Sequence, residues 1–143
     1  MGRLMFLDAS VIVAILNREP GFQAFQQQVG QSPTALLYSP LSRFEAIVSL
    51  ARNRAGPNRP ATPAQIEAVG ELVDALLSEL VAGNVDLTEN TGAGAVAAAQ
   101  AYGRAVGHPA GLNLGDCFAY ACAKEHRVGL LYKGDDFART DLG

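Results

Sequence analysis

The chain has 143 residues, the size of one ordinary domain, and we expect a single domain over 1–143. A composition of 49% hydrophobic and 17% charged residues indicates a folded protein and excludes an extensively disordered one. The net charge of −3 does not exclude nucleic acid as a partner. If four of the acidic residues bound a metal ion, the rest of the chain would carry a charge of +1.

No apolar run approaches the ~20 residues of a membrane helix. The segment 1–8 has only a short apolar stretch that ends at Asp8, which is typical of a core strand and not of a signal peptide. We therefore expect a cytoplasmic protein without a membrane partner.

Hydrophobic periodicity and helix-boundary residues predict an alternation of strands and helices. In chain order, the expected elements are a strand over 4–7, helices over 9–16 and after Pro20, a strand over 35–39, a helix over 41–54, a helix from 62 that ends at Gly83, a strand over 85–87, helices over 91–106 and 116–126, and a strand over 128–132. Such alternation predicts an α/β fold with a parallel sheet covered on both faces. In these sheets, sites lie at the carboxyl ends of the strands.

Two aspartates occupy positions suited either to structure or to chemistry. Asp8 directly follows the first strand, and Asp116 opens a helix after Gly115. Each could simply cap its helix. Neither position alone distinguishes a cap from a catalytic acid.

Glu45 is harder to explain as a surface residue. On the helix over 41–54 it lies between Leu41 and Val48, on an apolar face. A carboxylate buried there must be paired, protonated or metal-bound, because burying it bare costs several kcal/mol. A salt bridge to an arginine is the structural alternative.

Asp135 and Asp136 follow the last strand and precede Phe137, where they form either a turn or part of a site. Ser10 could hydrogen-bond the Asp8 carboxylate or a metal-bound water, or it could simply be a serine in the first turn of the helix. Acids at strand ends, together with a buried acid on a helix, are hard oxygen ligands of the kind that suits Mg²⁺ or Mn²⁺.

Four segments, in this order, resemble the PIN domain and specifically the VapC-type toxins of bacterial toxin–antitoxin pairs. The segments are Phe6–Ser10, Phe44–Ala46, Leu112–Ala121 and Leu130–Phe137. The resemblance extends over essentially the whole chain. One departure is that Gly134 stands where many PIN domains carry the first acid of Asp-x-Asp-Phe.

The resemblance implies a three-layer α/β/α sandwich around a parallel sheet of about four or five strands. It also implies a Mg²⁺-dependent endoribonuclease (Mn²⁺ as substitute), with a small antitoxin as partner and often a homodimer. The family's catalytic acids correspond to Asp8, Glu45, Asp116 and one of the last pair, with Asp8 and Asp116 as metal ligands. The motif register favours Asp136, and Asp135 remains the alternative. We expect Phe137 to be buried as an anchor and the segment before it to be extended, so that the two aspartates point in different directions.

Two other functions compete with this interpretation. A haloacid-dehalogenase-type phosphatase also has an aspartate after its first strand, but it needs a second aspartate where Ser10 stands. A PIN-like module that binds RNA without cleaving it would have lost acids that this chain retains. Cleavage that depends on Mg²⁺ would distinguish an enzyme from a binding module.

Overall fold

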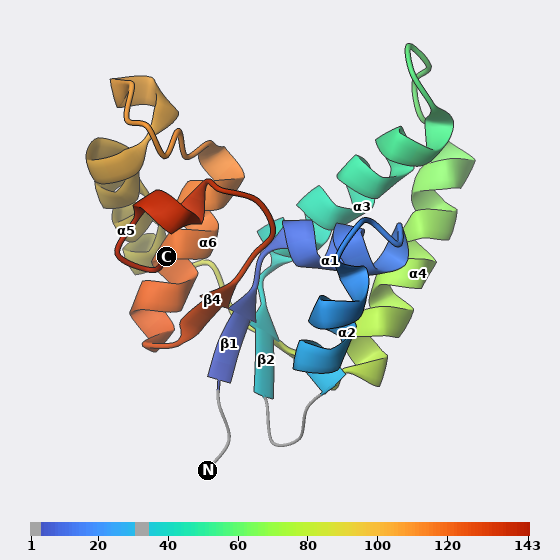
Figure 1. Cartoon of the computed structure of the whole chain (residues 1–143), viewed down its shortest axis with the longest axis horizontal. Coiled ribbons are helices and arrows are strands. Elements are labelled where there is room, and N and C mark those ends of the chain that lie inside the picture. Colours follow the sequence, from blue (N-terminus) through green and yellow to red (C-terminus); the bar gives the residue numbers. More distant parts are fainter. Residues whose placement is uncertain (1–3, 31–34) are drawn as a thin grey trace.

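A parallel sheet of four strands forms the centre of the molecule, as the alternation of strands and helices predicts (Figure 1). The computed structural model describes residues 4–30 and 35–143. The strands are β1 (Leu4–Leu7), β2 (Ala35–Tyr38), β3 (Gly83–Asn84) and β4 (Gly129–Leu131). Their order is β3-β2-β1-β4, so β1 has a neighbour on each side and its carboxyl end lies inside the sheet.

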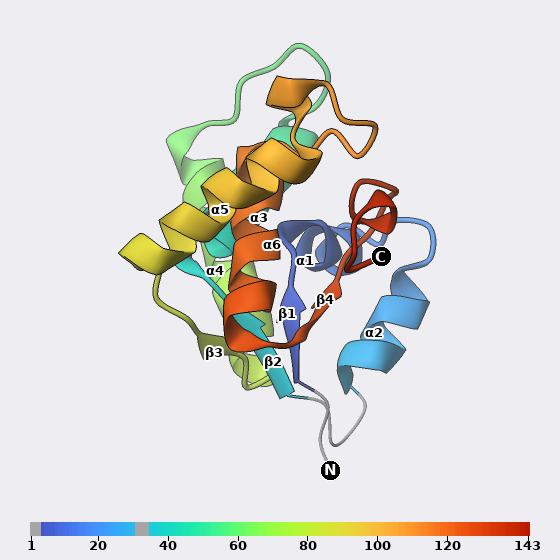
Figure 2. The same ribbon diagram turned by 90° about the vertical axis from the view of Figure 1, so that its left-hand side faces the viewer.

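Helices cover both faces of this sheet and complete the expected three layers. They are α1 (Ala9–Leu16), α2 (Phe22–Gly30), α3 (Pro40–Ala55), α4 (Pro63–Glu79), α5 (Glu89–Tyr102) and α6 (Leu114–His126), with short 3-10 turns η1 (Arg104–Val106) and η2 (Phe137–Arg139). The first four lie on one face, and Figure 2 looks onto the opposite face, covered by α5 and α6. Among the described residues, no helix combines the length and the apolar character needed to cross a membrane.

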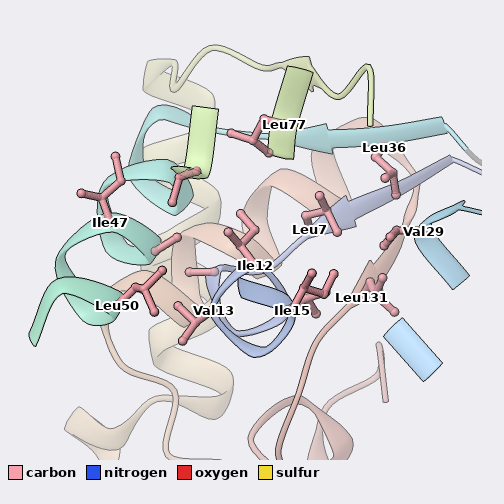
Figure 3. Close-up of a cluster of buried hydrophobic side chains, with 14 of the residues drawn as sticks. Leu7, Ile12, Val13, Ile15, Val29, Leu36, Ile47, Leu50, Leu77 and Leu131 are labelled. Atoms are coloured by element: carbon pink, nitrogen blue, oxygen red, sulfur yellow. The ribbon is translucent and has the colours of Figure 1, made fainter. Parts of the chain in front are cut away.

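The side chains of β1 alternate between two hydrophobic cores, as the pleat of a strand requires. Met5 and Leu7 pack with α1 to α4, whereas Phe6 packs with α5 and α6. Figure 3 shows the first core, to which Leu7 of β1 and Ile12 of α1 both belong. Both faces of β1 are therefore apolar, and its first polar side chain comes where the strand ends, at Asp8.

Several boundaries differ from the sequence-based prediction. The third strand is Gly83–Asn84 instead of 85–87, because only these residues pair with β2, and Val85 then donates one last hydrogen bond to Tyr38. Helix α4 ends at Glu79, before the predicted Gly83, and Val81 takes the left-handed conformation (φ 52°) in the turn that follows.

The ends of α5 and α6 also differ from the prediction. Helix α5 begins at Glu89 and ends at Tyr102, because Gly103 leaves the helix in an extended conformation. Helix α6 begins at Leu114, because Asn113 caps it. Asp116 therefore lies inside the first turn of α6 and does not precede it.

Candidate active site

Asp8 is both a helix cap and a buried acid at the carboxyl end of β1. Its Oδ2 accepts a hydrogen bond of 3.0 Å from the Ser10 amide, which starts α1, and its own amide donates to the Leu131 carbonyl of β4. Only 6% of the residue is exposed. Burial raises the pKa of Asp8, hydrogen bonds from Ser10 and from the Ala9 amide oppose this, and the charge of Asp136 raises it further. The cap interpretation is correct, and it leaves this carboxylate in the wall of a cavity.

Glu45 extends from α3 to the first turn of α6. Its carboxylate lies directly on Gly115, where any side chain would overlap it. None of the ion pairs formed by the described residues includes Glu45, so the arginine partner that we considered is not found there. Burial raises the pKa of Glu45 to about 7, and the charges of Asp8 and Asp116 contribute.

Asp116 lies in the first turn of α6, where it completes a capping box. Its Oδ2 accepts from the Asn113 amide at 3.1 Å, and its amide donates to Asn113 Oδ1 at 2.9 Å. Burial raises the pKa of Asp116 to about 6; the hydrogen bond from Asn113 opposes this, and the charges of Asp8 and Asp136 add to it. Like Asp8, Asp116 therefore both takes part in a helix cap and lies close to other acids.

Asp136 lies near the other acids, and Asp135 does not influence them. Asp136 raises the pKa of both Asp8 and Asp116, whereas Asp135 contributes to neither. Phe137 is buried (2% exposed), as expected of an anchor for this segment. The expectation of an extended backbone is wrong, because Asp136 has helical angles (φ −57°, ψ −51°) at the start of η2. The chain therefore turns at Asp136, and strand alternation does not apply there.

Ser10 connects α1 to the segment that carries these last acids. Its Oγ accepts a hydrogen bond of 2.9 Å from the Lys133 amide, just after β4, while its own amide holds Asp8. Lys133 Nζ is paired with Glu19 at 2.7 Å. The Lys133–Glu19 pair was not anticipated from the sequence, because the two residues are 114 positions apart.

A cavity of about 1090 Å³ brings three of the acids together. Asp8, Glu45 and Asp116 line it, whereas neither Asp135 nor Asp136 does so. On another side, polar and basic residues from the end of α3 and the following loop complete the wall. They are Arg52, Asn53, Asn58 and Arg59. No sequence motif pointed to this basic side of the cavity.

The acids fit a divalent cation by their chemistry, but they do not enclose one. In residues 4–30 and 35–143, no group of three or more His, Cys, Asp or Glu side chains is arranged to hold a metal ion. Mg²⁺, however, is usually held by one or two carboxylates, with waters and substrate phosphate oxygens as its other ligands. The neighbouring carboxylates also raise one another's pKa, and a bound cation would stabilise their ionised forms. The donor set therefore suits Mg²⁺ or Mn²⁺ in an open site.

Comparison with known proteins matches the PIN domain family over residues 5–142. A VapC ribonuclease of Rhizobium meliloti is 47% identical over 142 residues, which cover 98% of this chain and 100% of the relative. Among solved structures, VapC20 of Mycobacterium tuberculosis, a sarcin–ricin loop cleaving toxin, superposes with a TM-score of 0.68 at 14% identity, covering 94% of this chain and 92% of that one. A toxin–antitoxin complex from Klebsiella pneumoniae gives 0.64 at 17% identity, covering 96% and 93%.

Proposed function

The chain belongs to the PIN-domain family, among the VapC ribonucleases, and we propose that its acidic cavity is the active site of an endoribonuclease that requires Mg²⁺ or Mn²⁺. The observation that carries this proposal is the meeting of Asp8, Glu45 and Asp116 in one cavity, although they lie on three separate segments. Asp136 is our choice for the fourth acid, because its charge acts on two of the others. This membership leaves no support for the phosphatase alternative.

Asp8 and Asp116 would hold the metal, and each is fixed in place by the start of a helix. Asp8 is oriented by the Ser10 amide and Asp116 by the Asn113 amide, so neither carboxylate has to be ordered when the substrate arrives. A bound Mg²⁺ lowers the pKa of water from ~16 towards ~7 and neutralises charge on the scissile phosphate.

Glu45 is suited to moving protons in this reaction. Hydrolysis of a phosphodiester takes a proton from the attacking water and returns one to the leaving 3′-oxygen. A group with a pKa near the working pH does this most efficiently. In the metal-free protein, burial and the neighbouring acids Asp8 and Asp116 raise the pKa of the Glu45 carboxyl to about 7. Burial, the largest cause, would persist when a metal neutralises those acids, so the pKa should stay above its ordinary value and the Oε atoms could accept and return a proton.

The cognate inhibitor would be a small antitoxin, bound on the side of α5 and α6. An apolar groove of about 470 Å³ lies there, with the exposed side chains of Val96 (60%) and Leu114 (69%) in its wall. Asn113 lines both this groove and the acidic cavity. An antitoxin segment could therefore lay apolar side chains in the groove and place an arginine among the acids, where it would compete with the metal. We also propose that the toxin is a homodimer and acts in the cytoplasm.

Cleavage of RNA by the purified protein tests this function. We expect multiple-turnover cleavage with Mg²⁺ that EDTA abolishes, and products with a 5′-phosphate and a 3′-hydroxyl. Asp8→Asn and Asp116→Asn should each lower the rate by about a hundredfold or more, while Asp86→Asn, at an exposed acid outside the cavity, should not. Binding without cleavage would support the alternative of a non-cleaving module. Products with 2′,3′-cyclic phosphate would exclude the metal mechanism.

A further inference from the structure

One face of α3 carries polar side chains that line the cavity and lead away from the acids. Glu45, Ser49 and Arg52 are four and seven residues apart, so they lie along one side of the helix. All three line the cavity. At 1.5 Å of rise per residue, the step from Glu45 to Arg52 is about 10 Å along the helix axis. This face therefore leads from the reacting centre towards a positive charge.

The loop after α3 continues the same wall. In Figure 1, α3 and α4 run outward beside each other, and the loop that joins them forms the tip. Asn58 and Arg59 of this loop line the cavity together with Arg52. Both arginines are exposed.

Unlike the other cations near the cavity, these two arginines have no ion-pair partner among the described residues. Lys133 is paired with Glu19. Arg43, in the second turn of α3, is paired with Asp74 on α4. Within the described part of the chain, Arg52 and Arg59 form no ion pair or side-chain hydrogen bond. Their guanidinium groups are free to bind an anion.

An exposed aromatic ring stands at the acidic end of the same wall. Phe44 precedes Glu45 on α3, lines the cavity and is 60% exposed. Bases of single-stranded RNA stack on exposed aromatic rings, whereas paired bases are already stacked in their duplex.

We propose that Phe44, Arg52 and Arg59 form a track for single-stranded RNA that leads into the acidic cavity, with Phe44 stacking an unpaired base and the arginines binding phosphates on one side of the cleaved bond. This inference rests on the proposed ribonuclease function. Charge complementarity favours RNA over the antitoxin as occupant, because Arg52 and Arg59 attract phosphates and repel the arginine that we expect the antitoxin to place among the acids. The track also explains how a protein with a net charge of −3 holds a polyanion.

Salt-dependent binding tests the track separately from catalysis. The parent protein is Asp116→Asn with Mg²⁺, and the probe is a short fluorescent single-stranded RNA of mixed sequence, alone or annealed to its complement. Arg52→Gln and Arg59→Gln should each reduce the slope of log K against log salt by about 0.7, the effect of one phosphate contact on a single strand. Phe44→Leu should weaken binding by about fivefold or more without changing the slope.

Arg127→Gln is the matched control. Arg127 is exposed, lies at the far end of α6 from Asp116, and does not line the cavity. It should change neither affinity nor slope, and the parent should prefer the single strand to the duplex. If the parent binds RNA but the three track variants behave like Arg127→Gln, the track is wrong and the wall serves a protein partner. If the wild type does not cleave RNA and the parent does not bind it, the proposed function fails and the track fails with it.

Discussion

The Glu45 carboxylate lies directly on the α-carbon of Gly115, at the start of α6. The contact joins residues 70 positions apart and holds the end of the Glu45 side chain near Asp8 and Asp116, both of which act on its pKa. A Cβ at this position would fit only if the Glu45 carboxylate moved away. Gly115 is therefore a positioning residue for the acid that we assign to proton transfer.

Replacing Gly115 with alanine should displace Glu45 and reduce activity. We expect Gly115→Ala to slow Mg²⁺-dependent cleavage by about a hundredfold, because small shifts of reacting groups have effects of this size. The free energy of unfolding should change by no more than about 1 kcal/mol, because only the end of the flexible Glu45 side chain has to move. Gly92→Ala is the control, since Gly92 is also helical and a Cβ there meets nothing within 4 Å. It should keep full activity. Full activity of Gly115→Ala would show that the Glu45–Gly115 contact is unimportant.

The metal-free protein should lose stability as the pH rises through the range in which its acids ionise. The pKa values of Glu45 (about 7) and Asp116 (about 6) lie above their ordinary values of 4.5 and 3.8. The folded state therefore binds more protons than the unfolded chain between about pH 4 and pH 7, so stability falls as the pH increases. Both carboxylates partly face solvent, so we expect a decrease in melting temperature of only about 2–4 °C.

Thermal melting in EDTA at pH 5 and pH 8 measures this effect. Glu45→Gln should make the pH dependence flatter, because it removes the group with the larger shift. Adding Mg²⁺ at pH 8 should raise the melting temperature of the wild type, by binding to the folded state alone. A pH dependence unchanged by Glu45→Gln would contradict the raised pKa of this residue.

The apolar groove on α5 and α6 should matter for the antitoxin and not for catalysis. Val96→Ser should weaken antitoxin binding by roughly five- to tenfold, the effect of losing about one buried apolar contact. Cleavage by the free toxin should stay unchanged. Val81→Ser is the control, because Val81 is 86% exposed and lies outside the groove. Calorimetry with the purified antitoxin measures both, and equal affinities of the two variants would rule out the groove as the binding surface.

Features that depend on neighbouring residues could be predicted from the sequence. The strand before Asp8 is apolar on both faces, and the helix predicted from 62 begins there with a capping box between Thr62 and Gln65. Contacts between distant segments could not be predicted in this way. The fit of Glu45 on Gly115 depends on how α3 and α6 pack, and no local pattern reports it.

The sequence also did not predict correctly where β3 lies or where the chain turns after β4. The register of β3 is determined by its pairing with β2, which places it at Gly83 before the more apolar Val85. The segment at Asp136 was expected to be extended because it follows a strand, but the chain turns there into η2. The basic wall with Arg52 was missed because α3 brings it to the cavity only after folding.

The fourth acid can be identified by replacing Asp135 and Asp136 one at a time. Asp136 acts on the pKa of both Asp8 and Asp116, and the buried ring of Phe137 fixes the backbone beside it. We expect Asp136→Asn to reduce Mg²⁺-dependent cleavage by about a hundredfold or more, and Asp135→Asn to stay close to the wild type, because Asp135 affects neither acid. Since both side chains are exposed, both variants should fold, and equal melting temperatures would verify this. An inactive Asp135→Asn beside an active Asp136→Asn would reverse the assignment. If both remain active, the site works with three acids, and the two aspartates only form the turn that leads into η2.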